Sequence, residues 1–547
     1  MSPKTSLTLR ANNLEMRPTA LLSSLLRAFS QKYTFLNPKS RKMSTRSYKE
    51  AVEHLNSLQS NAAALEAVRS SGGRLSEFAI PEMLEYLGRI GYSPNDLNTL
   101  NVIHITGTKG KGSTSAFTDS ILRHALPGMK IGLYTSPHLV AVRERIRING
   151  APITEEQFAT YFFEVWDRLV INDMRRSPST SVMPGYFRFV TLVAFHAFLD
   201  LKVDATILEV GVGGTYDSTN IVPKPVVTGI TALGIDHVAV LGKTIQDIAW
   251  QKGGIFKDSV PAITVDQPPE GMKVLEDRAK ELKVSEFCVA PFIPGLSDIQ
   301  LGLAGIHQIQ NAGLAVALAR SFLKSRTFVN EVEPLPESFV AGLQETKWPG
   351  RCQTVVDPKR RKTTWYLDGA HTVESLECCM QWFVDPDVGL ERSRSRPMRV
   401  LVFNCTSGRS GPAFLSSVFS KIAAQLKIHD QAEDAESFFD HVIFCANVTY
   451  ADGHFKGAKA SDLTTLAIPT DDLAELKTQR QLASAWSTSV PSFPSTKIHV
   501  LPSIEHAVNE IEKIESGSEE PVKILVAGSL HLVGGVIEVA GLSSVAL

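Results

Sequence analysis

The chain has 547 residues, of which 43% are hydrophobic and 21% are charged, and its formal net charge at pH 7 is −1. This length exceeds what one hydrophobic core usually organises, so we expect two domains plus appendages. The near-zero net charge gives no global field that would attract nucleic acid or an anionic membrane, so neither is expected as a partner. The longest apolar runs are too short to span a bilayer, so no transmembrane helix and no integral membrane contact are predicted.

The first 46 residues form a basic leader. They contain nine Lys or Arg residues, a single acid at Glu15, and many Ser and Thr residues. Five apolar side chains fall on one face at helical spacing: Leu21, Leu22, Leu25, Leu26 and Phe29. This pattern predicts mitochondrial targeting, to the matrix or the inner-membrane periphery, with a disordered basic tail as the alternative. Met43 would start a shorter form, so a cytoplasmic location is expected as well.

The next part of the chain alternates between helical and strand-like patterns. Residues 48–70 predict a helix with Ala51, Leu55, Leu58, Ala62 and Leu65 on one stripe. Short β-rich runs follow at 101–107, 130–136, 205–211, 226–234 and 260–265. Their nearly continuous apolar character is typical of parallel strands that helices cover on both faces. We therefore predict an α/β domain with a central, mostly parallel sheet.

A second α/β alternation fills the C-terminal part of the chain. Residues 331–339, rich in Pro and Glu, are interpreted as a surface connection. Strands are then predicted at 363–370, 399–405, 440–448, 497–503 and 523–529, which indicates a smaller Rossmann-like domain. The polar stretches 390–397 and 429–437 are interpreted as solvated loops. The predicted divisions are a leader at 1–46, a first domain at 47–345 and a second domain at 346–547.

The stretch 105-ITGTKGKGST-114 follows the first predicted strand and precedes a helical pattern. It does not fit the spacing G-x-x-x-x-G-K-[ST], because Ile105 stands where the first glycine would be required. Gly107, Gly110 and Gly112 still allow successive N–H groups to converge, and the helix that begins near Ser113 adds its positive end. The stretch therefore predicts a phosphate-binding loop, with an ordinary Gly-rich turn as the alternative.

Two side chains of this loop are candidates for nucleotide chemistry. Lys111 would reach the β- and γ-phosphates, and Ser113 stands where the hydroxyl often holds magnesium. Two lysines within one ordinary turn, Lys109 and Lys111, would repel each other without an anion. Their spacing therefore favours phosphate binding.

Polar residues at other strand ends are further candidates, because open α/β sheets build their sites there. Glu209 ends a predicted strand, and a carboxylate is a suitable ligand for magnesium. His237 follows another strand, where a lone histidine is more often structural than a ligand. Ser136, taken alone, is typical of a helix cap or a turn.

The remaining candidates lie near the predicted domain boundary. Lys252 precedes a Gly-Gly that indicates a helix end, and by itself it is interpreted as a surface lysine. Arg351, in 348-WPGRCQ-353, could neutralise phosphate charge in a transition state. Asp368 and His371, in 366-YLDGAH-371, stand at the end of a predicted strand facing the first domain.

Together these motifs resemble one family. GTKGKGS, YTSPHLVAVRERIRING, PGYFRFVTLVAFHAFL, LEVGVGGTYDSTN, LGIDH, IAWQKGGIFK, HQIQNA, WPGR, YLDGAH and GSLHLVGG are similar, in content and order, to eukaryotic folylpolyglutamate synthases of the Mur ligase superfamily. The similarity runs from about residue 48 to about residue 540. The resemblance implies a Mur ligase-like fold, with a P-loop ATPase domain followed by a C-terminal ligase domain.

The resemblance implies an ATP-dependent amide ligase. It would add L-glutamate to the γ-carboxyl of a tetrahydrofolyl-(poly)glutamate, through an acyl phosphate, and release ADP and phosphate. The implied cofactors are ATP and Mg²⁺, with a monovalent cation such as K⁺ as a further candidate. The partners would be the two small-molecule substrates, and a monomer is the default expectation.

The resemblance also assigns roles to residues. Lys111 and Arg351 would bind phosphate within a cradle formed by Gly110, Lys111, Gly112 and Ser113, while Ser136, Glu209 and His237 would hold magnesium. Lys252 would become a carbamate, which changes a cation into a metal-binding anion. Asn311 and Asp368 would contact the nucleotide, and His371 and Ser529 would lie around the incoming glutamate and ATP. Segments 134–139 and 184–189 would border the folate, because its flat pterin ring packs well against aromatic side chains.

One stretch departs from the family, and two other functions remain open. Residues 404-NCTSGRSGP-412 keep Arg409 but lack the acids of a Gly-Asp-Arg-Asp pattern. Dihydrofolate synthase, which adds the first glutamate to dihydropteroate, shares the ATP motifs and is the nearest alternative. A nucleotide-dependent switch without ligase chemistry is the alternative from another class.

Overall fold

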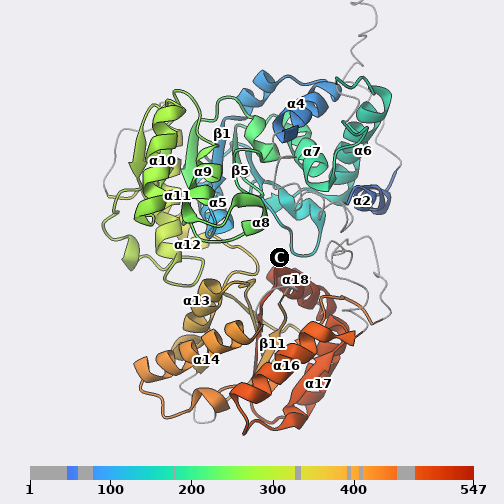
Figure 1. The fold of residues 1–547 in the computed structure, drawn as a ribbon, viewed down its shortest axis with the longest axis vertical. Helices are drawn as coiled ribbons and strands as arrows, with labels where there is room; N and C mark the ends of the chain where they lie inside the picture. The colour runs from blue at the N-terminus through green and yellow to red at the C-terminus, as the bar shows by residue number, and fades with distance from the viewer. Residues whose placement is uncertain are drawn as a thin grey trace, which may run out of the picture. The chain divides into compact units, whose positions relative to one another are not determined.

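The computed structural model describes residues 46–59, 78–176, 180–326, 334–390, 396–405, 411–451 and 475–547. These residues form two β-sheets, one with eight strands and one with six, each covered by helices (Figure 1). All ten predicted strands are present, and the predicted α/β class is confirmed. The predicted leader, apart from Arg46, lies outside the described residues.

The eight-stranded sheet has the order β4-β3-β2-β5-β1-β6-β7-β8. All its neighbours are parallel except for the pairs β2–β3 and β3–β4, which are antiparallel. The sequence patterns did not predict β3, β4 or β8, which lie at or next to the edges of the sheet. The strands are β1 Val102–Thr106, β2 Ile131–Tyr134, β3 Ile146–Ile148, β4 Ala151–Pro152, β5 Ala205–Glu209, β6 Val227–Ile230, β7 Ala262–Thr264 and β8 Phe287–Val289.

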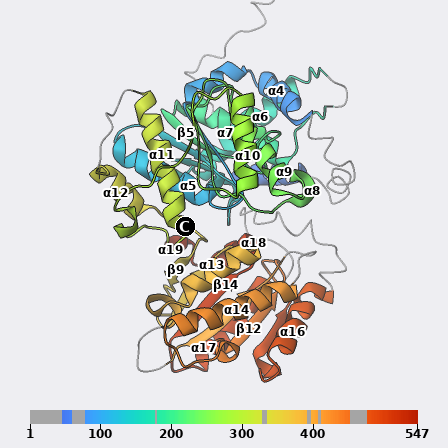
Figure 2. The ribbon, with the colours of Figure 1, turned by 60° about the vertical axis from the view of Figure 1, so that its left-hand side comes forward.

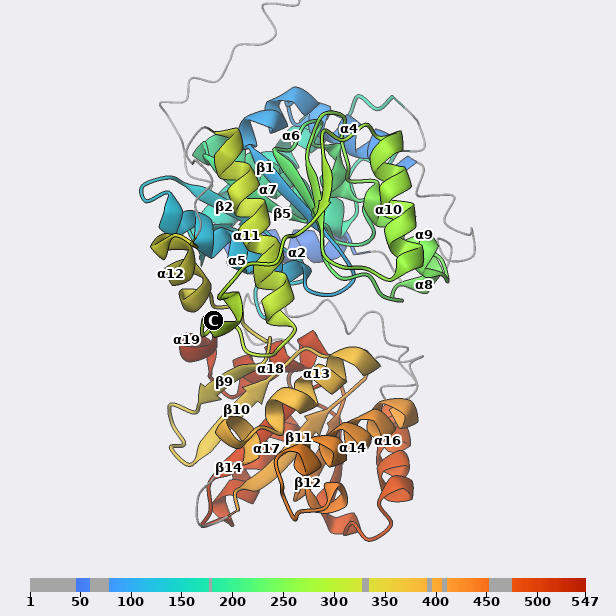
Figure 3. The ribbon, with the colours of Figure 1, turned by 90° about the vertical axis from the view of Figure 1, so that its left-hand side faces the viewer.

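Residues of these strands contribute to three hydrophobic cores, one of which contains Ile230 of β6 and Ala262 of β7 together with α9 and α10. Ile103 and Ile105 of β1 belong to the core built with α5, α11 and α12, which lie beside one another in Figure 3. Val102 belongs to the opposite core, with α2, α4, α6 and α7. The helices are α2 Tyr48–Ser57, α4 Ala79–Arg89, α5 Lys111–Ala125, α6 Glu155–Ile171, α7 Tyr186–Leu201, α8 Val238–Leu241, α9 Ile245–Gly253, α10 Pro269–Glu281, α11 Gln308–Ser325 and α12 Glu337–Glu345.

The helix predicted at 48–70 is confirmed for residues 48–57. It begins at Tyr48 with a capping box formed by Ser47 and Glu50, and it ends at Ser57. The carbonyl of Leu58 accepts a hydrogen bond from the backbone N–H of Tyr186, at the start of α7, at 3.1 Å. A tertiary contact thus takes the carbonyl that a longer helix would use itself. Residues 60–70 lie outside the described part of the chain.

The six-stranded sheet has the order β13-β12-β11-β14-β10-β9 and is parallel except for the edge strand β9. Helices α13, α14 and α16 share one core with it, and α17 and α18 share the other (Figure 2). The strands are β9 Gln353–Val356, β10 Thr363–Leu367, β11 Met398–Phe403, β12 His441–Cys445, β13 Ile498–Leu501 and β14 Val522–Ala527; the helices are α13 Val373–Phe383, α14 Gly411–Ile428, α16 Lys477–Ser489, α17 Ile504–Ser516, α18 Leu530–Val539 and α19 Ser543–Ala546.

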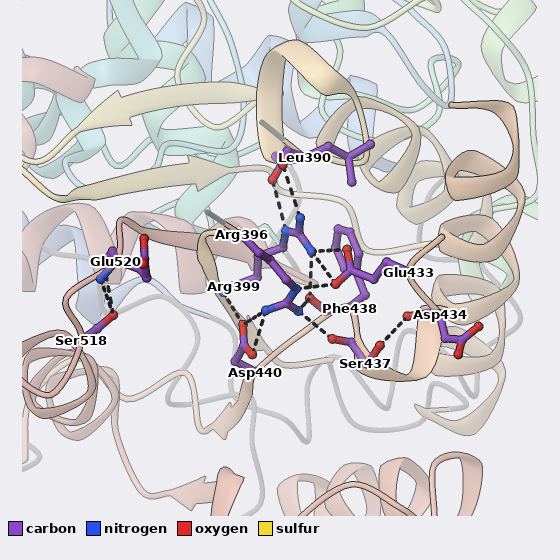
Figure 4. A network of polar contacts seen from close by, with 11 residues as sticks. Leu390, Arg396, Arg399, Glu433, Asp434, Ser437, Phe438, Asp440, Ser518 and Glu520 are labelled. Carbon is purple, nitrogen blue, oxygen red and sulfur yellow. Dashed lines mark hydrogen bonds and ion pairs between the residues drawn. The ribbon is translucent and has the colours of Figure 1, made fainter. Parts of the chain in front are cut away.

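An ion-pair network joins the two polar stretches that were interpreted as solvated loops (Figure 4). Arg396 contacts Glu433 at 2.6 Å and Asp440 at 2.8 Å, and Arg399 contacts Glu433 at 2.8 Å. The Arg399 side chain is buried at the start of β11. The loop interpretation was therefore incomplete, because sequence spacing alone could not show that these charges meet.

The connection predicted at 331–339 is shorter than expected, since α12 begins at Glu337, directly after Pro336. Proline suits this place because it needs no N–H partner at a helix start. Residues 327–333 lie outside the described ranges, and so does Arg409 of the 404–412 loop. The predicted boundary at 345–346 falls between α12 and β9 and stays a prediction. Within the described residues, no helix has both the length and the apolar character to cross a membrane.

Candidate active site

The Gly-rich loop lies between β1 and α5, as its sequence predicts. Gly110 has φ +89°, and a Cβ there would lie 2.1 Å from Oδ1 of Asn311. At Gly107, a Cβ would lie 1.7 Å from Oγ1 of Thr231. Thr231 donates its hydroxyl to the carbonyl of Lys109 at 2.6 Å, which fastens the loop to the end of β6. Glycine is therefore required at both positions, by close approach and, at Gly110, by backbone conformation.

Two lysines converge on this loop from different elements. Lys111 Nζ, in the first turn of α5, donates to the carbonyl of Gly107 at 3.0 Å. Lys252 Nζ, near the end of α9, donates to the same carbonyl at 2.7 Å. The Lys252 side chain is buried, so its interpretation as a surface lysine is wrong. The predicted helix end at Gly253 is confirmed.

Burial and mutual repulsion shift the titration of both lysines. Burial lowers the pKa of Lys252 well below its ordinary value, and the nearby Lys111 charge lowers it further. Burial also lowers the pKa of Lys111, while the carboxylates of Glu209 and Asp236 oppose that shift. A buried pair of ammonium groups costs free energy unless anions surround it. The arrangement therefore suits a ligand rich in negative charge.

Glu209 places a carboxylate at the end of β5, beside the loop. Its side chain is buried, and Oε2 accepts a hydrogen bond from the backbone N–H of Ser136 at 3.0 Å. Burial raises the pKa of Glu209, and the charges of Lys111 and Arg351 oppose that shift. The structure thus brings together Glu209 and Ser136, two of the three residues predicted at strand ends, and within the described residues no hydrogen bond or ion pair joins the third, His237, to either of them.

Asp236 is a residue that the sequence reasoning missed. It accepts from Lys109 Nζ at 3.3 Å, lies 3.8 Å from His371 Nε2, and accepts from the backbone N–H of His237 at 2.9 Å. Burial alone would raise the pKa of Asp236, but His371 and Lys109 hold it below its ordinary value. The available signal was its place directly before His237 in the LGIDH motif. Asp236 therefore links the phosphate loop to a histidine of the second sheet.

The predicted metal ligands have suitable chemistry. Burial lowers the pKa of His237, which favours the neutral imidazole that a metal requires. Glu209 supplies a buried carboxylate, and Ser136 a hydroxyl. In the part of the chain that the structure describes, no three His, Cys, Asp or Glu side chains converge as a metal-binding group. That result is compatible with the predicted set, in which only two of the ligands are of these types.

The second sheet contributes a turn that carries Arg351 and His371. Asp368, at the end of β10, accepts from the backbone N–H groups of Cys352 at 2.6 Å and of Ala370 at 2.8 Å. Both carboxylate oxygens therefore hold the two backbone segments that flank Arg351 and His371. Arg351 donates to the carbonyl of Gly350 at 2.9 Å, and its charge reaches Lys111 and Glu209. Asp368 thus organises the turn in this structure.

Ser529 and Asn311 complete the predicted set. Ser529 caps α18 by accepting from the N–H of His531, and it accepts from Asn447 Nδ2 at 3.3 Å. Ser529 makes no hydrogen bond or ion pair with the other predicted site residues within the described ranges. Asn311 donates to Oε1 of Gln308 at 2.9 Å and lies against Gly110.

The sequence of the whole chain is similar to those of known proteins. No family model matches the chain. Folylpolyglutamate synthases of Saccharomyces cerevisiae strains are 45% identical to it over 512 residues, which cover 91% of this chain and 88% of theirs.

Solved structures show the same fold. Folylpolyglutamate synthase of Mycobacterium tuberculosis, complexed with ADP, has a TM-score of 0.64 at 23% identity, covering 90% of this chain and 98% of that chain. The Thermotoga maritima enzyme has a TM-score of 0.61 at 23% identity, covering 91% and 97%. The predicted Mur ligase-like architecture is confirmed by these matches. With its Gly-rich loop and facing charged turn, and at 45% identity over most of its length, the chain belongs to the folylpolyglutamate synthase family.

Proposed function

We propose that the chain is an ATP-dependent ligase that adds L-glutamate to the γ-carboxyl of a tetrahydrofolyl-(poly)glutamate and releases ADP and phosphate. The observation that carries this function is the meeting of charged groups from both sheets. Lys111 and Glu209 come from the first sheet, and Arg351 and His371 come from the second. Membership of the folylpolyglutamate synthase family supports the choice of folate and glutamate as substrates.

The residues present fit the two chemical steps of this reaction. In the first, a carboxylate oxygen of folate attacks the γ-phosphorus of ATP, the bond to the bridging oxygen breaks, and ADP leaves. Lys111 and Arg351 would stabilise the charge that develops on the transferred phosphoryl group. In the second, the neutral amine of glutamate attacks the acyl carbon, the C–O bond breaks, phosphate leaves, and the nitrogen loses one proton to solvent and keeps the other as the amide N–H. His371, held near Asp236, would orient the incoming glutamate.

Magnesium would be held by Glu209, His237 and Ser136, and when bound it would neutralise phosphate charge. Lys252 would join this set as a carbamate. The lowered pKa of Lys252 supports that proposal, because only a neutral amine can form a bond to carbon dioxide. A monovalent cation such as K⁺ is a further candidate cofactor.

Mass spectrometry of products tests the function directly. Incubation of the protein with ATP, L-glutamate and tetrahydrofolate should lengthen the folate by glutamyl units, with ADP formed only when both substrates are present. Extension of dihydropteroate alone would instead identify the dihydrofolate synthase reaction. ATP turnover that ignores both substrates would identify a nucleotide-dependent switch.

The location and oligomeric state belong to the same proposal. The basic composition of residues 1–46 supports mitochondrial targeting, and Met43 supports a second, cytoplasmic form. A fluorescent reporter fused to residues 1–46 should enter mitochondria, and a diffuse signal would contradict the targeting. Light scattering after gel filtration should give the mass of one chain, and a mass of two or more would contradict the monomer.

A further inference from the structure

Arg145 is a buried cation at the carboxyl-end edge of the first sheet. It directly precedes β3, and its carbonyl accepts from the backbone N–H of Thr135, beside Ser136, at 3.1 Å. Only 6% of its surface is exposed. Its Nε donates to Nδ1 of His138 at 3.0 Å, and its guanidinium lies 5.5 Å from the centre of the Tyr186 ring.

No carboxylate forms a salt bridge with this guanidinium within the described part of the chain, and the Glu209 carboxylate interacts with it only as a nearby charge. The neighbouring carboxylate, that of Glu144, instead accepts from the backbone N–H groups of Leu139, Val140 and Ala141 at 2.6 to 3.1 Å. Within the described residues the Nη atoms of Arg145 make no hydrogen bond, so their donors are available to a ligand. A buried charge without a counter-ion is costly. An anion bound beside Arg145 would therefore offset the free-energy cost of burying its charge.

The position of Arg145 in the sheet narrows the choice of anion. Along the order β3-β2-β5-β1, Arg145 lies three strands from the loop that follows β1, a separation of about 14 Å at the usual strand spacing. Since the ATP phosphates are assigned to that loop, Arg145 is available for a different anion. Burial raises the pKa of Glu209, which ends β5 between β2 and β1, and the Arg145 charge opposes that shift. Burial lowers the pKa of His531 in α18, and the Arg145 charge lowers it further. Arg145 thus lies on the far side of the reaction centre from the phosphate loop.

The surroundings of Arg145 suit the glutamyl end of a folate. The centre of the Tyr186 ring lies 5.5 Å from the guanidinium carbon of Arg145. The neighbouring Phe187 ring packs against the Tyr134 ring and against the backbone of Gly211. These aromatic residues and the loop that carries His138 lie in the part of the chain built around the first sheet. The residues predicted to surround the incoming glutamate, His371 and Ser529, follow strands of the second sheet. A folate that offers its γ-carboxylate to the phosphoryl group still carries one more charge nearby, its α-carboxylate.

We propose that Arg145 binds the α-carboxylate of the terminal glutamyl residue of the folate substrate and thereby selects acceptors that already carry a glutamate. This role rests on the proposed ligase function. Arg145 is a specificity-determining residue in this view, since it holds the acceptor while other groups serve the phosphoryl transfer.

The test pairs one substitution with one altered substrate. Wild-type protein should extend tetrahydrofolate roughly 10- to 100-fold more efficiently, as kcat/KM, than its analogue with an α-carboxamide and a free γ-carboxyl. Arg145→Gln should erase this preference by raising the KM for tetrahydrofolate, with the KM values for ATP and L-glutamate unchanged. Arg145→Lys should restore part of it. Equal losses on both substrates, or a raised KM for L-glutamate instead, would overturn the proposal.

Two controls keep the result interpretable. Arg89→Gln removes another buried arginine, which donates to the carbonyls of Leu169 and Asn172, so it should lower the melting temperature without changing substrate preference. Calorimetric binding of tetrahydrofolate and its α-carboxamide, without turnover, separates the two hypotheses. An Arg145-dependent binding preference in a protein that ligates nothing would refute the proposed function alone, whereas ligation without any preference would refute the Arg145 proposal alone.

Discussion

Lys252 and Lys111 donate to one backbone oxygen, that of Gly107, at 2.7 and 3.0 Å. Two ammonium groups on one carbonyl repel each other at close range in a buried place, which favours loss of a proton from the more buried amine. The direction of the Lys252 pKa shift agrees with this reasoning. The relationship also shows that α9 and the phosphate loop form one electrostatic unit, although 145 residues separate them in sequence.

Replacing Lys252 tests whether it becomes an anion. Lys252→Ala should lower ligase turnover by at least about 100-fold, as expected for loss of about 3 kcal/mol of transition-state stabilisation. If the working species is a carbamate, an added small carboxylate such as acetate should restore part of the activity. Steady-state rates with and without acetate measure this. Lys257→Ala, which removes another mostly buried lysine of the same segment, is the matched control and should show no rescue by acetate. A Lys252→Ala enzyme that acetate leaves unchanged would remove the main support for the carbamate.

Replacing Asp236 tests the link between the two sheets. Asp236→Asn keeps the shape but removes the charge that holds Lys109 and His371. We expect kcat/KM for glutamate to fall about 10- to 100-fold, which corresponds to the usual value of a charged hydrogen bond. A double-mutant cycle with His371→Gln should show non-additive losses because the two residues act together. Asp247→Asn, at the exposed cap of α9, is the control and should leave kcat/KM unchanged. Additive losses in the cycle would contradict the link.

A side chain at Gly110 would have both a steric cost and a conformational cost, and Gly128 provides a comparison in which only the conformational cost is present. Gly110→Ala places a methyl group 2.1 Å from Asn311 Oδ1 and forces φ +89° on an L-residue, so the loop must move. We expect binding of a non-hydrolysable ATP analogue to weaken more than 10-fold, measured by calorimetry. Gly128 has φ +90° and nothing within 4 Å of the added Cβ, so Gly128→Ala should cost only about 1–2 kcal/mol of folding stability. Equal nucleotide affinity in the two variants would show that the loop tolerates the contact.

His104 makes the stability of the first sheet depend on pH. Its Nε2 donates to Thr219 Oγ1, which donates to Asp217, and burial lowers the pKa of His104 from 6.5 to about 3, with the charge of Lys257 adding to the effect. Because the folded pKa is below the unfolded one, the unfolded chain binds more protons between these values, and stability falls as pH falls through this window. Between pH 7.5 and 5 the wild type should lose about 2 kcal/mol more unfolding free energy than His104→Gln. Urea titrations at both pH values measure this difference, and identical losses in the two proteins would refute it.

Much of the fold follows from local pattern. The ten predicted strands were recoverable because each is an apolar run flanked by turn residues, and buried parallel strands need no partner to show that pattern. The strands that were missed, β3, β4, β8 and β9, lie at or next to sheet edges. These strands form because they hydrogen-bond to a neighbouring strand, so the local sequence pattern alone does not predict them. The early end of α2 has a similar cause, since a carbonyl of that segment bonds to α7.

The sequence by itself determined the Gly-rich loop, the family, and the placing of Glu209 and Ser136 at strand ends; His237 was expected to close a strand, but it lies at the N-cap of α8, well after β6 ends at Ile230. Each of these depends on residues that are close together in the chain or on motifs in order. Only the tertiary structure decided that Lys252 is buried, that it shares a carbonyl with Lys111, that Asp236 reaches His371, and that Arg145 forms no salt bridge among the described residues. These facts concern the electrostatic surroundings of a charge, and those surroundings are built by segments that meet only when the chain folds.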